Sequence, residues 1–266
     1  MLTLGNGRGW TEVQVRKAQP GIAPLTTGIL AAVAGISYSS WVLEFPLHTK
    51  VDVIDGYVSE LSASDQPSHW LFSAGDLVAG VLMMYVAVSC LRTLRRRPWS
   101  VVGWGFLMLF GISAIGDSVF AMDCAPSTDT ACALRERAGR VSFSHQFHDV
   151  TSSVVVFAGI AALFSLSVAA RRYGWWPALA RWAWVLAVGE ALTALATLVL
   201  MYLGVWLGLA QRVQISVLCL GLLLIAWTLL AGHFVRPNAL SPYRERPAVQ
   251  SPPHERLSIK EKAGTG

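Results

Sequence analysis

Histidine and acidic side chains recur at helical spacing in this chain. His145, His148 and Ser152 are separated by three and four residues, and Ser113 and Asp117 by four. Residues at these spacings lie on neighbouring turns of one helix face. Imidazole and carboxylate groups that face one another can transfer protons or bind a metal ion. Acid–base and metal-assisted chemistry are therefore what these residue types favour.

Zinc is the metal that the residue types suit best. His145 and His148, together with Asp76 and Asp117, offer two imidazoles and two carboxylates, a set compatible with Zn²⁺. The H-x-x-H spacing lets both histidines bind from one helix face, but the H-E-x-x-H motif of zinc hydrolases is absent. The G-x-S-x-G elbow of serine hydrolases is absent as well. A zinc site is an alternative here, not the leading prediction.

Six apolar segments must position these side chains. Of the residues, 54% are hydrophobic and only 14% are charged, whereas about a quarter are charged in an ordinary soluble domain. A helix rises about 1.5 Å per residue, so about 20 apolar residues cross the hydrocarbon core of a bilayer. We therefore predict an all-α membrane protein, a bundle of six transmembrane helices. The predicted spans are residues 22–45, 69–91, 100–122, 147–170, 179–203 and 213–232.

Positive charge gathers on one set of connections between the spans. Sixteen of the 21 Lys and Arg residues lie in the two tails and in the connections after the second and fourth spans. The positive-inside rule places these segments in the cytoplasm of a plasma-membrane protein. We expect a cytoplasmic tail over 1–20, a transmembrane domain over 21–235 and a disordered cytoplasmic tail over 236–266. Topology and anionic lipid explain the basic charge, so we expect no nucleic acid partner.

The first outside loop, 46–68, has apolar residues at helical spacing. Ile54, Val58 and Leu61 fall on one face, with Asp55 and Glu60 on others. This pattern is typical of a short amphipathic helix at a membrane interface. We expect it to pack over the mouth of the bundle.

The second outside loop, 123–144, contains Cys124 and Cys132. An extracytoplasmic compartment permits disulfides, and a bridge closing so short a loop would stabilise it by about 2–3 kcal/mol. We predict a disulfide between these two cysteines. Cys90 and Cys219 lie in predicted spans and are expected to be small core residues.

The polar stripes of different spans also agree in depth. An ionised residue at the centre of a membrane helix costs about 2.5–3.5 kcal/mol, so such residues usually face a bundle interior and serve a function. We therefore predict one outward-opening polar cavity. The structural alternative is that the carboxyl groups are neutral and bonded to Ser or Thr, or paired with Arg212. The predicted cavity residues are Glu44, Glu60, Asp76, Asp117, His145, His148, Asp149, Glu190 and Arg212.

Two stretches carry a family resemblance. One is YVSELSA at 57–63, followed by Pro67, Trp70 and Phe72; the other is MDCAP at 122–126, followed by Cys132 and HQFH at 145–148. These motifs resemble a bacterial membrane family known as domain of unknown function 998, over about residues 20 to 235. The resemblance implies a protein with several membrane spans and does not assign it a reaction.

Three functions suit these features. The leading hypothesis is a cavity that recognises the headgroup of a membrane lipid or other amphiphile, with Asp76, Asp117, His145, His148 and Glu190 as its polar groups. The second is an acid–base or metal-dependent hydrolase or transferase of outer-leaflet lipid, in which His148 or Asp117 transfers protons. The third is a proton-coupled transporter that uses Glu190 and Asp76. Whether the protein is an enzyme is left open by the sequence.

Overall fold

The computed structural model describes residues 22–234, and this part of the chain is helical with no strand. The predictions for the two tails, 1–20 and 236–266, lie outside the described residues. The helices are α1 (Leu25–Tyr38), η1 (Ser40–Leu43), α2 (Glu44–Leu47), η2 (Val58–Ser62), α3 (His69–Thr93), α4 (Pro98–Val119), α5 (Thr130–Arg137), α6 (Phe143–Tyr173), η3 (Leu179–Ala183), α7 (Trp184–Leu203) and α8 (Leu207–Phe234).

Five of these helices, or continuous pairs of them, are long and apolar enough to cross a membrane. α1 and the following Ser40–Leu47 segment are bent by 44° relative to one another. They form a sixth span if the two segments are counted as one. The prediction of a multi-span, all-helical protein is therefore confirmed. The first span, predicted over 22–45, is interrupted, because the α-helix stops at Tyr38. Ser39 donates its backbone N–H to both Gly35 and Ile36, which tightens the chain into the 3₁₀ turn of η1.

Small residues let the helices approach closely. An added Cβ on Gly80 of α3 would lie 2.6 Å from the carbonyl oxygen of Gly111 on α4, and the reverse holds as well. On the other side of the bundle, Leu218 of α8 packs over Gly159 of α6, and Leu163 of α6 packs over Gly221 of α8. Contacts of this kind are what holds helices together in a membrane, where the hydrophobic effect between them is missing.

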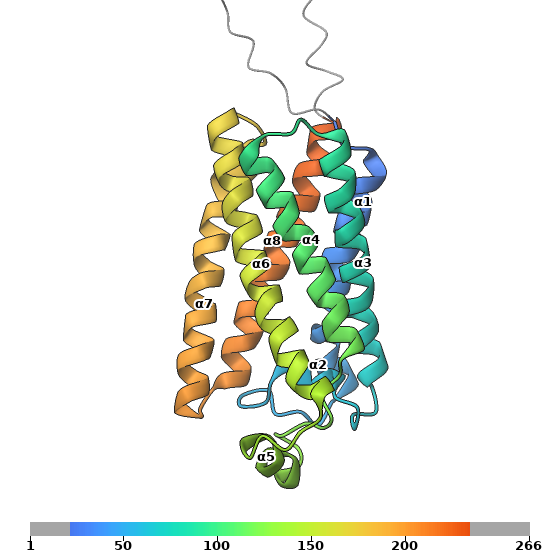
Figure 1. The fold of residues 1–266 in the computed structure, drawn as a ribbon, viewed down its shortest axis with the longest axis vertical. Helices are drawn as coiled ribbons and strands as arrows, with labels where there is room; N and C mark the ends of the chain where they lie inside the picture. The colour runs from blue at the N-terminus through green and yellow to red at the C-terminus, as the bar shows by residue number, and fades with distance from the viewer. Residues whose placement is uncertain (1–21, 235–266) are drawn as a thin grey trace, which may run out of the picture. The chain divides into compact units, whose positions relative to one another are not determined.

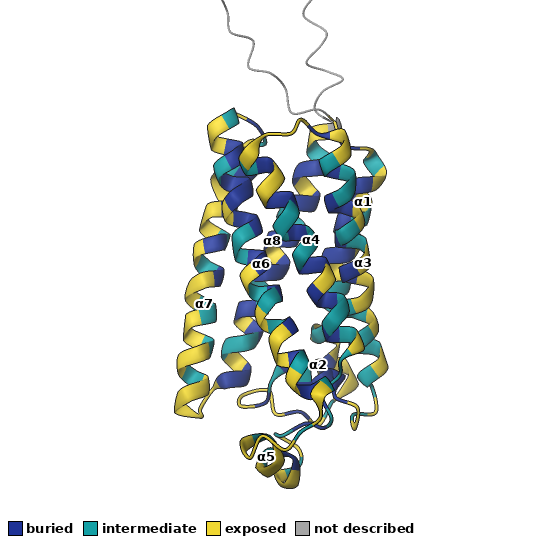
Figure 2. Ribbon diagram, in the orientation of Figure 1, coloured by how far each residue is buried: buried dark blue, intermediate teal, exposed yellow. Residues whose placement is uncertain are grey.

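The helix α7 is the least buried of the long helices. Only 11% of its most apolar window is buried, against 33–56% in the others. Its buried residues are Ala187 and Glu190, and Figure 2 shows exposed residues along most of its length. Large apolar side chains such as Leu195 and Leu198 cover this surface, as expected for a helix that faces lipid.

Two long loops cover one end of the bundle, which we call the loop end (Figure 1). They are residues 48–68, which include η2, and residues 120–142, which include α5. The first loop was predicted to hold an amphipathic helix from Ile54 onward, but its helical part is only the five-residue η2. The Asp52 side chain accepts the backbone N–H groups of Ile54 and Asp55 and so fixes a turn before η2 begins. Val58 and Leu61 of η2 are buried.

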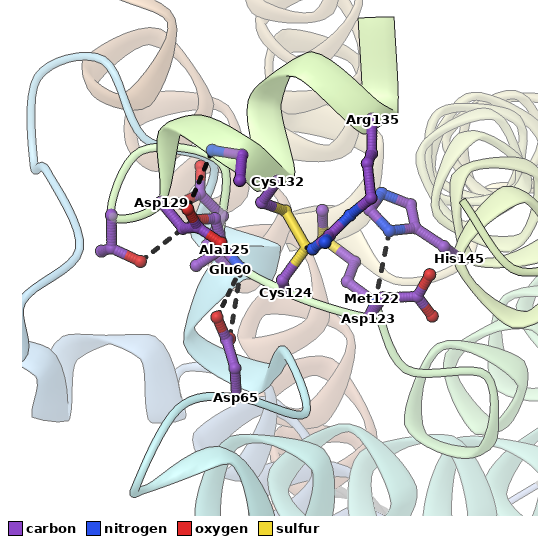
Figure 3. Close-up of a disulfide and its surroundings, with 12 residues drawn as sticks. Glu60, Asp65, Met122, Asp123, Cys124, Ala125, Asp129, Cys132, Arg135 and His145 are labelled. Atoms are coloured by element: carbon purple, nitrogen blue, oxygen red, sulfur yellow. Dashed lines mark hydrogen bonds between the residues drawn. A yellow bond between two sulfur atoms is a disulfide. The ribbon is translucent and has the colours of Figure 1, made fainter. Parts of the chain in front are cut away.

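The second loop is closed by the predicted disulfide. Cys124 and Cys132 are bonded, with their Cα atoms 6.1 Å apart, and Cys132 belongs to α5 (Figure 3). Asp129 caps this helix by accepting the backbone N–H of Ala131 at 2.8 Å. Cys90 and Cys219 are free and buried, as expected of core residues.

Candidate functional site

Glu44 and Arg212 form a buried ion pair at the loop end. Arg212 Nε donates to Glu44 Oε1 at 2.7 Å, and Arg212 Nη2 donates to Oε2 at 2.6 Å. Arg212 Nη1 donates to the carbonyl oxygens of Gly56 and Gly208. The ion pair thus ties α2, the first loop and α8 together. Both residues were predicted to line a cavity, but all of the nitrogens of Arg212 are already used, and neither residue belongs to the walls of the two cavities described below.

Glu60 joins the two loops and was also predicted to line the cavity. Its Oε1 accepts the backbone N–H of Tyr57, and its Oε2 accepts the backbone N–H and the hydroxyl of Ser127. Asp65 makes a similar link by accepting the backbone N–H of Ala125 (Figure 3). Because Glu60 is 1% exposed and bonded at both oxygens, we assign it a structural role.

His145 lies apart from the other predicted site residues. Its Nδ1 accepts the backbone N–H of Asp123 at 3.3 Å, beside the disulfide (Figure 3). Burial would raise the pKa of Asp123, but hydrogen bonds from Ser142 and the nearby His145 and Arg135 outweigh burial and lower it. His145 therefore helps to hold the second loop, and it lines neither cavity described below.

Asp117 of α4 and His148 of α6 form the chemical centre of the loop end. Thr151 and Ser152 each donate a hydroxyl hydrogen bond to Asp117. His148 Nδ1 lies 2.9 Å from the carbonyl oxygen of Phe120 and 3.8 Å from Asp117. A carbonyl oxygen only accepts, so Nδ1 carries a proton and Nε2 of the neutral ring is an acceptor. This Nε2 is buried and has no hydrogen-bond partner among the described residues.

Two adjoining cavities meet at this centre. The small cavity has a volume of about 90 Å³ and contains Asp76, Asp117 and His148 in its wall. The large cavity has a volume of about 460 Å³ and lies between α6, α7 and α8, beneath Tyr57 and Glu136 of the two loops. Residues that line both cavities are Ser59, His148, Ser152, Val156, Gln211 and Gln214.

Asp76 is the least satisfied acidic group of the small cavity. It lies on α3, two turns from the loop end, and accepts no hydrogen bond from any residue in the described range. Asp117 of α4 lines the same cavity. The prediction that Asp76 and Asp117 come together from different helices therefore agrees with the cavity wall.

Acidic groups continue into the large cavity, where Glu136 and Asp149 contribute to the wall. Burial raises the pKa of Glu136, and the nearby Asp149 and Glu60 raise it further. Burial, followed by Glu136 and Glu60, also raises the pKa of Tyr57 to about 12. Burial is the largest cause of both pKa shifts, and the neighbouring acidic groups add to it.

Glu190 is fully buried on α7 but lines neither cavity. Its carboxylate oxygens have no hydrogen-bond partner of ordinary geometry within residues 22–234. Gln214 of α8, which lines both cavities, is close enough to affect its charge. Glu190 was predicted to line the cavity, but it belongs to neither of the two walls.

The four residues predicted as a zinc set do not come together. Asp117 and His148 are neighbours, but the His145 ring is held at Asp123. Nowhere in the described part of the chain do three or more His, Cys, Asp or Glu side chains form a group that could hold a metal ion. The helical spacing of His145 and His148 did not reveal that the two rings bond different residues of the second loop, Asp123 and Phe120 respectively.

Several cavity residues were absent from the predicted set. Ser59, Gln211 and Gln214 line both cavities, and Gln211 accepts the backbone N–H of Val58 at 2.6 Å. A signal for the two glutamines exists in the sequence, because they flank Arg212 at the start of an apolar span. Ser59 has no such signal, since its place depends on the fold of the first loop.

The fold and the cavities together define a multi-span helical membrane protein with a polar site near one end of its bundle. A family model described as "Protein of unknown function (DUF998)" matches residues 31–228. The chain belongs to this family, in agreement with the resemblance of its two motifs. No curated protein and no solved structure matches it significantly.

Proposed function

We propose that this protein binds an amphiphile at the loop end of its helix bundle. The polar group would occupy the small cavity at Asp76, Asp117 and His148, and the apolar chain would lie in the large cavity. The observation that carries the proposal is the junction of a polar cavity with a larger one that shares part of its wall. An amphiphile has the same two-part character.

The wall of the large cavity supports an apolar occupant that comes from the membrane. Val156, Ala194, Leu198 and Met201 contribute apolar surface to it. Leu198 and Met201 are also about half exposed on the outside of α7. The cavity therefore borders the surface that α7 turns to lipid, and a lipid tail can reach it without crossing water.

Two independent features favour an extracytoplasmic loop end in the plasma membrane. Most Lys and Arg residues belong to the other side by the positive-inside rule. The disulfide lies in a loop at this end, and disulfides persist outside the reducing cytoplasm. The proposed ligand is thus an amphiphile of the outer leaflet, and the tails are cytoplasmic.

Native mass spectrometry of the full chain in mild detergent tests this proposal. Val156 lines both cavities, so we expect Val156→Trp to fill them and to remove a co-purifying amphiphile seen on the wild type. Val150→Trp is the matched control, since Val150 is exposed on the same helix and lines neither cavity. Equal amphiphile content in both variants would contradict the proposal.

The geometry of His148 favours one second function, an acid–base hydrolase of such a lipid. Nδ1 is held by the Phe120 carbonyl beside Asp117, which leaves Nε2 free to take a proton from water. Incubation with outer-leaflet lipids, followed by mass spectrometry of the products, tests this function. Hydrolysis should be lost in His148→Gln and kept in His145→Gln. A wild type that forms no product would rule it out.

A further inference from the structure

The charges around the two cavities are of one sign. Four acidic residues line them: Asp76, Asp117, Glu136 and Asp149. Within the described residues, no Lys or Arg belongs to either wall. Arg212 is not in either wall, and its guanidinium already donates hydrogen bonds to Glu44, Gly56 and Gly208. The walls of the two cavities therefore contain no fixed cation, although Arg137 of the second loop acts on Glu136 of the large cavity.

In the wall of the small cavity, Asp76 and Nε2 of His148 are acceptors without a hydrogen-bond partner among the described residues, and the indole N–H of Trp41 is a buried donor without one. Asp76 accepts no hydrogen bond from the described part of the chain. His148 is 3% exposed, and its Nε2 is left without a partner although the residue lines both cavities. Buried polar atoms are satisfied in almost all proteins, so an unpaired one in a cavity wall points to a missing group. A group that satisfies Asp76 and His148 must donate hydrogen bonds.

We propose that the bound amphiphile carries a primary ammonium group, which enters the small cavity and donates to Asp76 and to Nε2 of His148. This inference rests on the proposed binding function and names its ligand class. An ammonium has three N–H donors and no acceptor, so it matches this wall. Its positive charge also balances the acidic groups of Asp76 and Asp117.

Other headgroups fit less well. A phosphate, sulfate or carboxylate brings negative charge and acceptors to a wall that already has both, and like charges in so enclosed a site repel strongly. A trimethylammonium group has the right charge but no donor. The small cavity, at about 90 Å³, has room for an ammonium and a few carbon atoms.

The experiment measures binding of defined probes to the full chain in nanodiscs of neutral lipid. The probes are dodecylamine, dodecanol, dodecanoate and butylamine, and the readout is the shift of the thermal unfolding midpoint with probe concentration. Each probe is compared between wild type, Asp76→Asn and Asp55→Asn. Asp55 is exposed at the loop end and lines neither cavity, and Asn keeps an acceptor for the backbone N–H of Trp206. It controls for non-specific attraction of amines to the acidic end.

We expect dodecylamine to stabilise the wild type and Asp55→Asn alike, and to bind Asp76→Asn about tenfold more weakly or worse, because a buried charge partner is lost. Dodecanol and dodecanoate should bind at least about tenfold more weakly than dodecylamine to the wild type. Butylamine, which has no long chain to fill the large cavity, should bind weakly as well.

Other results would overturn the inference in separable ways. If dodecanol binds as tightly as dodecylamine, the cavity takes amphiphiles but does not select an amine. If butylamine binds as tightly, the site takes a soluble amine and the amphiphile is wrong. If no probe shifts the midpoint and Val156→Trp also keeps its co-purifying lipid, the proposed function itself fails. An equal effect of Asp55→Asn and Asp76→Asn would place the attraction outside the cavity.

Discussion

At the scale of single residues, Glu44 and Arg212 show how a protein offsets the unfavourable free energy of burying two charged groups. Their side chains are 2% and 4% exposed, and each oxygen of the carboxylate accepts one N–H of the guanidinium. A buried pair with this geometry offsets much of its own desolvation. Removal of one partner leaves the other charged, buried and unpaired, and that state is strongly unfavourable.

We therefore predict that Glu44→Gln lowers the free energy of unfolding by about 3–5 kcal/mol. Reversible unfolding in mixed detergent and denaturant measures this change. The double variant Glu44→Leu with Arg212→Met should lose less than Glu44→Gln alone, because no charge is left behind. A loss below about 1 kcal/mol in the single variant, in the range of exposed pairs, would show that water reaches the ion pair.

Part of the site was predictable at this scale. Spacing of three and four placed Asp117, His148 and Ser152 on faces that do meet, and Asp76 and Asp149 also reach cavity walls. Glu60 was also included in the predicted cavity set, but its carboxylate bonds Ser127 of the other loop. Helical periodicity gives the face of a side chain but not its hydrogen-bond partner in a loop.

At the scale of helices, close packing rests on where glycine is found. Gly111 and Gly105 both belong to α4, but only Gly111 touches a neighbouring backbone. A Cβ on Gly111 would lie 2.6 Å from the Gly80 carbonyl oxygen and 3.0 Å from the Met84 nitrogen, whereas one on Gly105 would meet nothing within 4 Å. The two positions form a matched pair.

Gly111→Ala is expected to lower the free energy of unfolding by about 1–3 kcal/mol, since α3 and α4 must separate to make room. Gly105→Ala should be neutral or stabilising by up to about 1 kcal/mol, because alanine favours the helix. Thermal unfolding of both variants in the same detergent compares them directly. Equal destabilisation of the two would refute the close α3–α4 contact.

The spans themselves followed from hydropathy, and the errors lie at their ends. The fourth span was predicted from residue 147, but α6 begins at Phe143 because the Ser142 side chain accepts the backbone N–H of His145 and caps the helix. The break after Tyr38 was missed as well, since an average over apolar residues does not register a local change in hydrogen bonding.

At the scale of the whole molecule, the orientation in the bilayer remains a prediction. It depends on the distribution of Lys and Arg and on the disulfide at the loop end. The two arguments are independent, because one concerns charge and the other the redox state of a compartment.

Reporter fusions test this orientation. Green fluorescent protein fused after residue 266 should fluoresce, because it folds in the cytoplasm. Alkaline phosphatase inserted after Asp129 should be active, because it needs an oxidising compartment. In intact cells, a thiol reagent that does not cross membranes should label Cys124 or Cys132 only after reduction. An active phosphatase on the C-terminal tail would reverse the orientation.

The disulfide-closed loop also contributes Glu136 to the wall of the large cavity. In the proposed orientation, the loop must be exported and its thiols oxidised before that wall is complete. Newly made chains would then pass through an immature stage in which the bundle is inserted but cannot yet retain its ligand. Oxidative maturation would thus time the start of binding and keep it from beginning during biosynthesis.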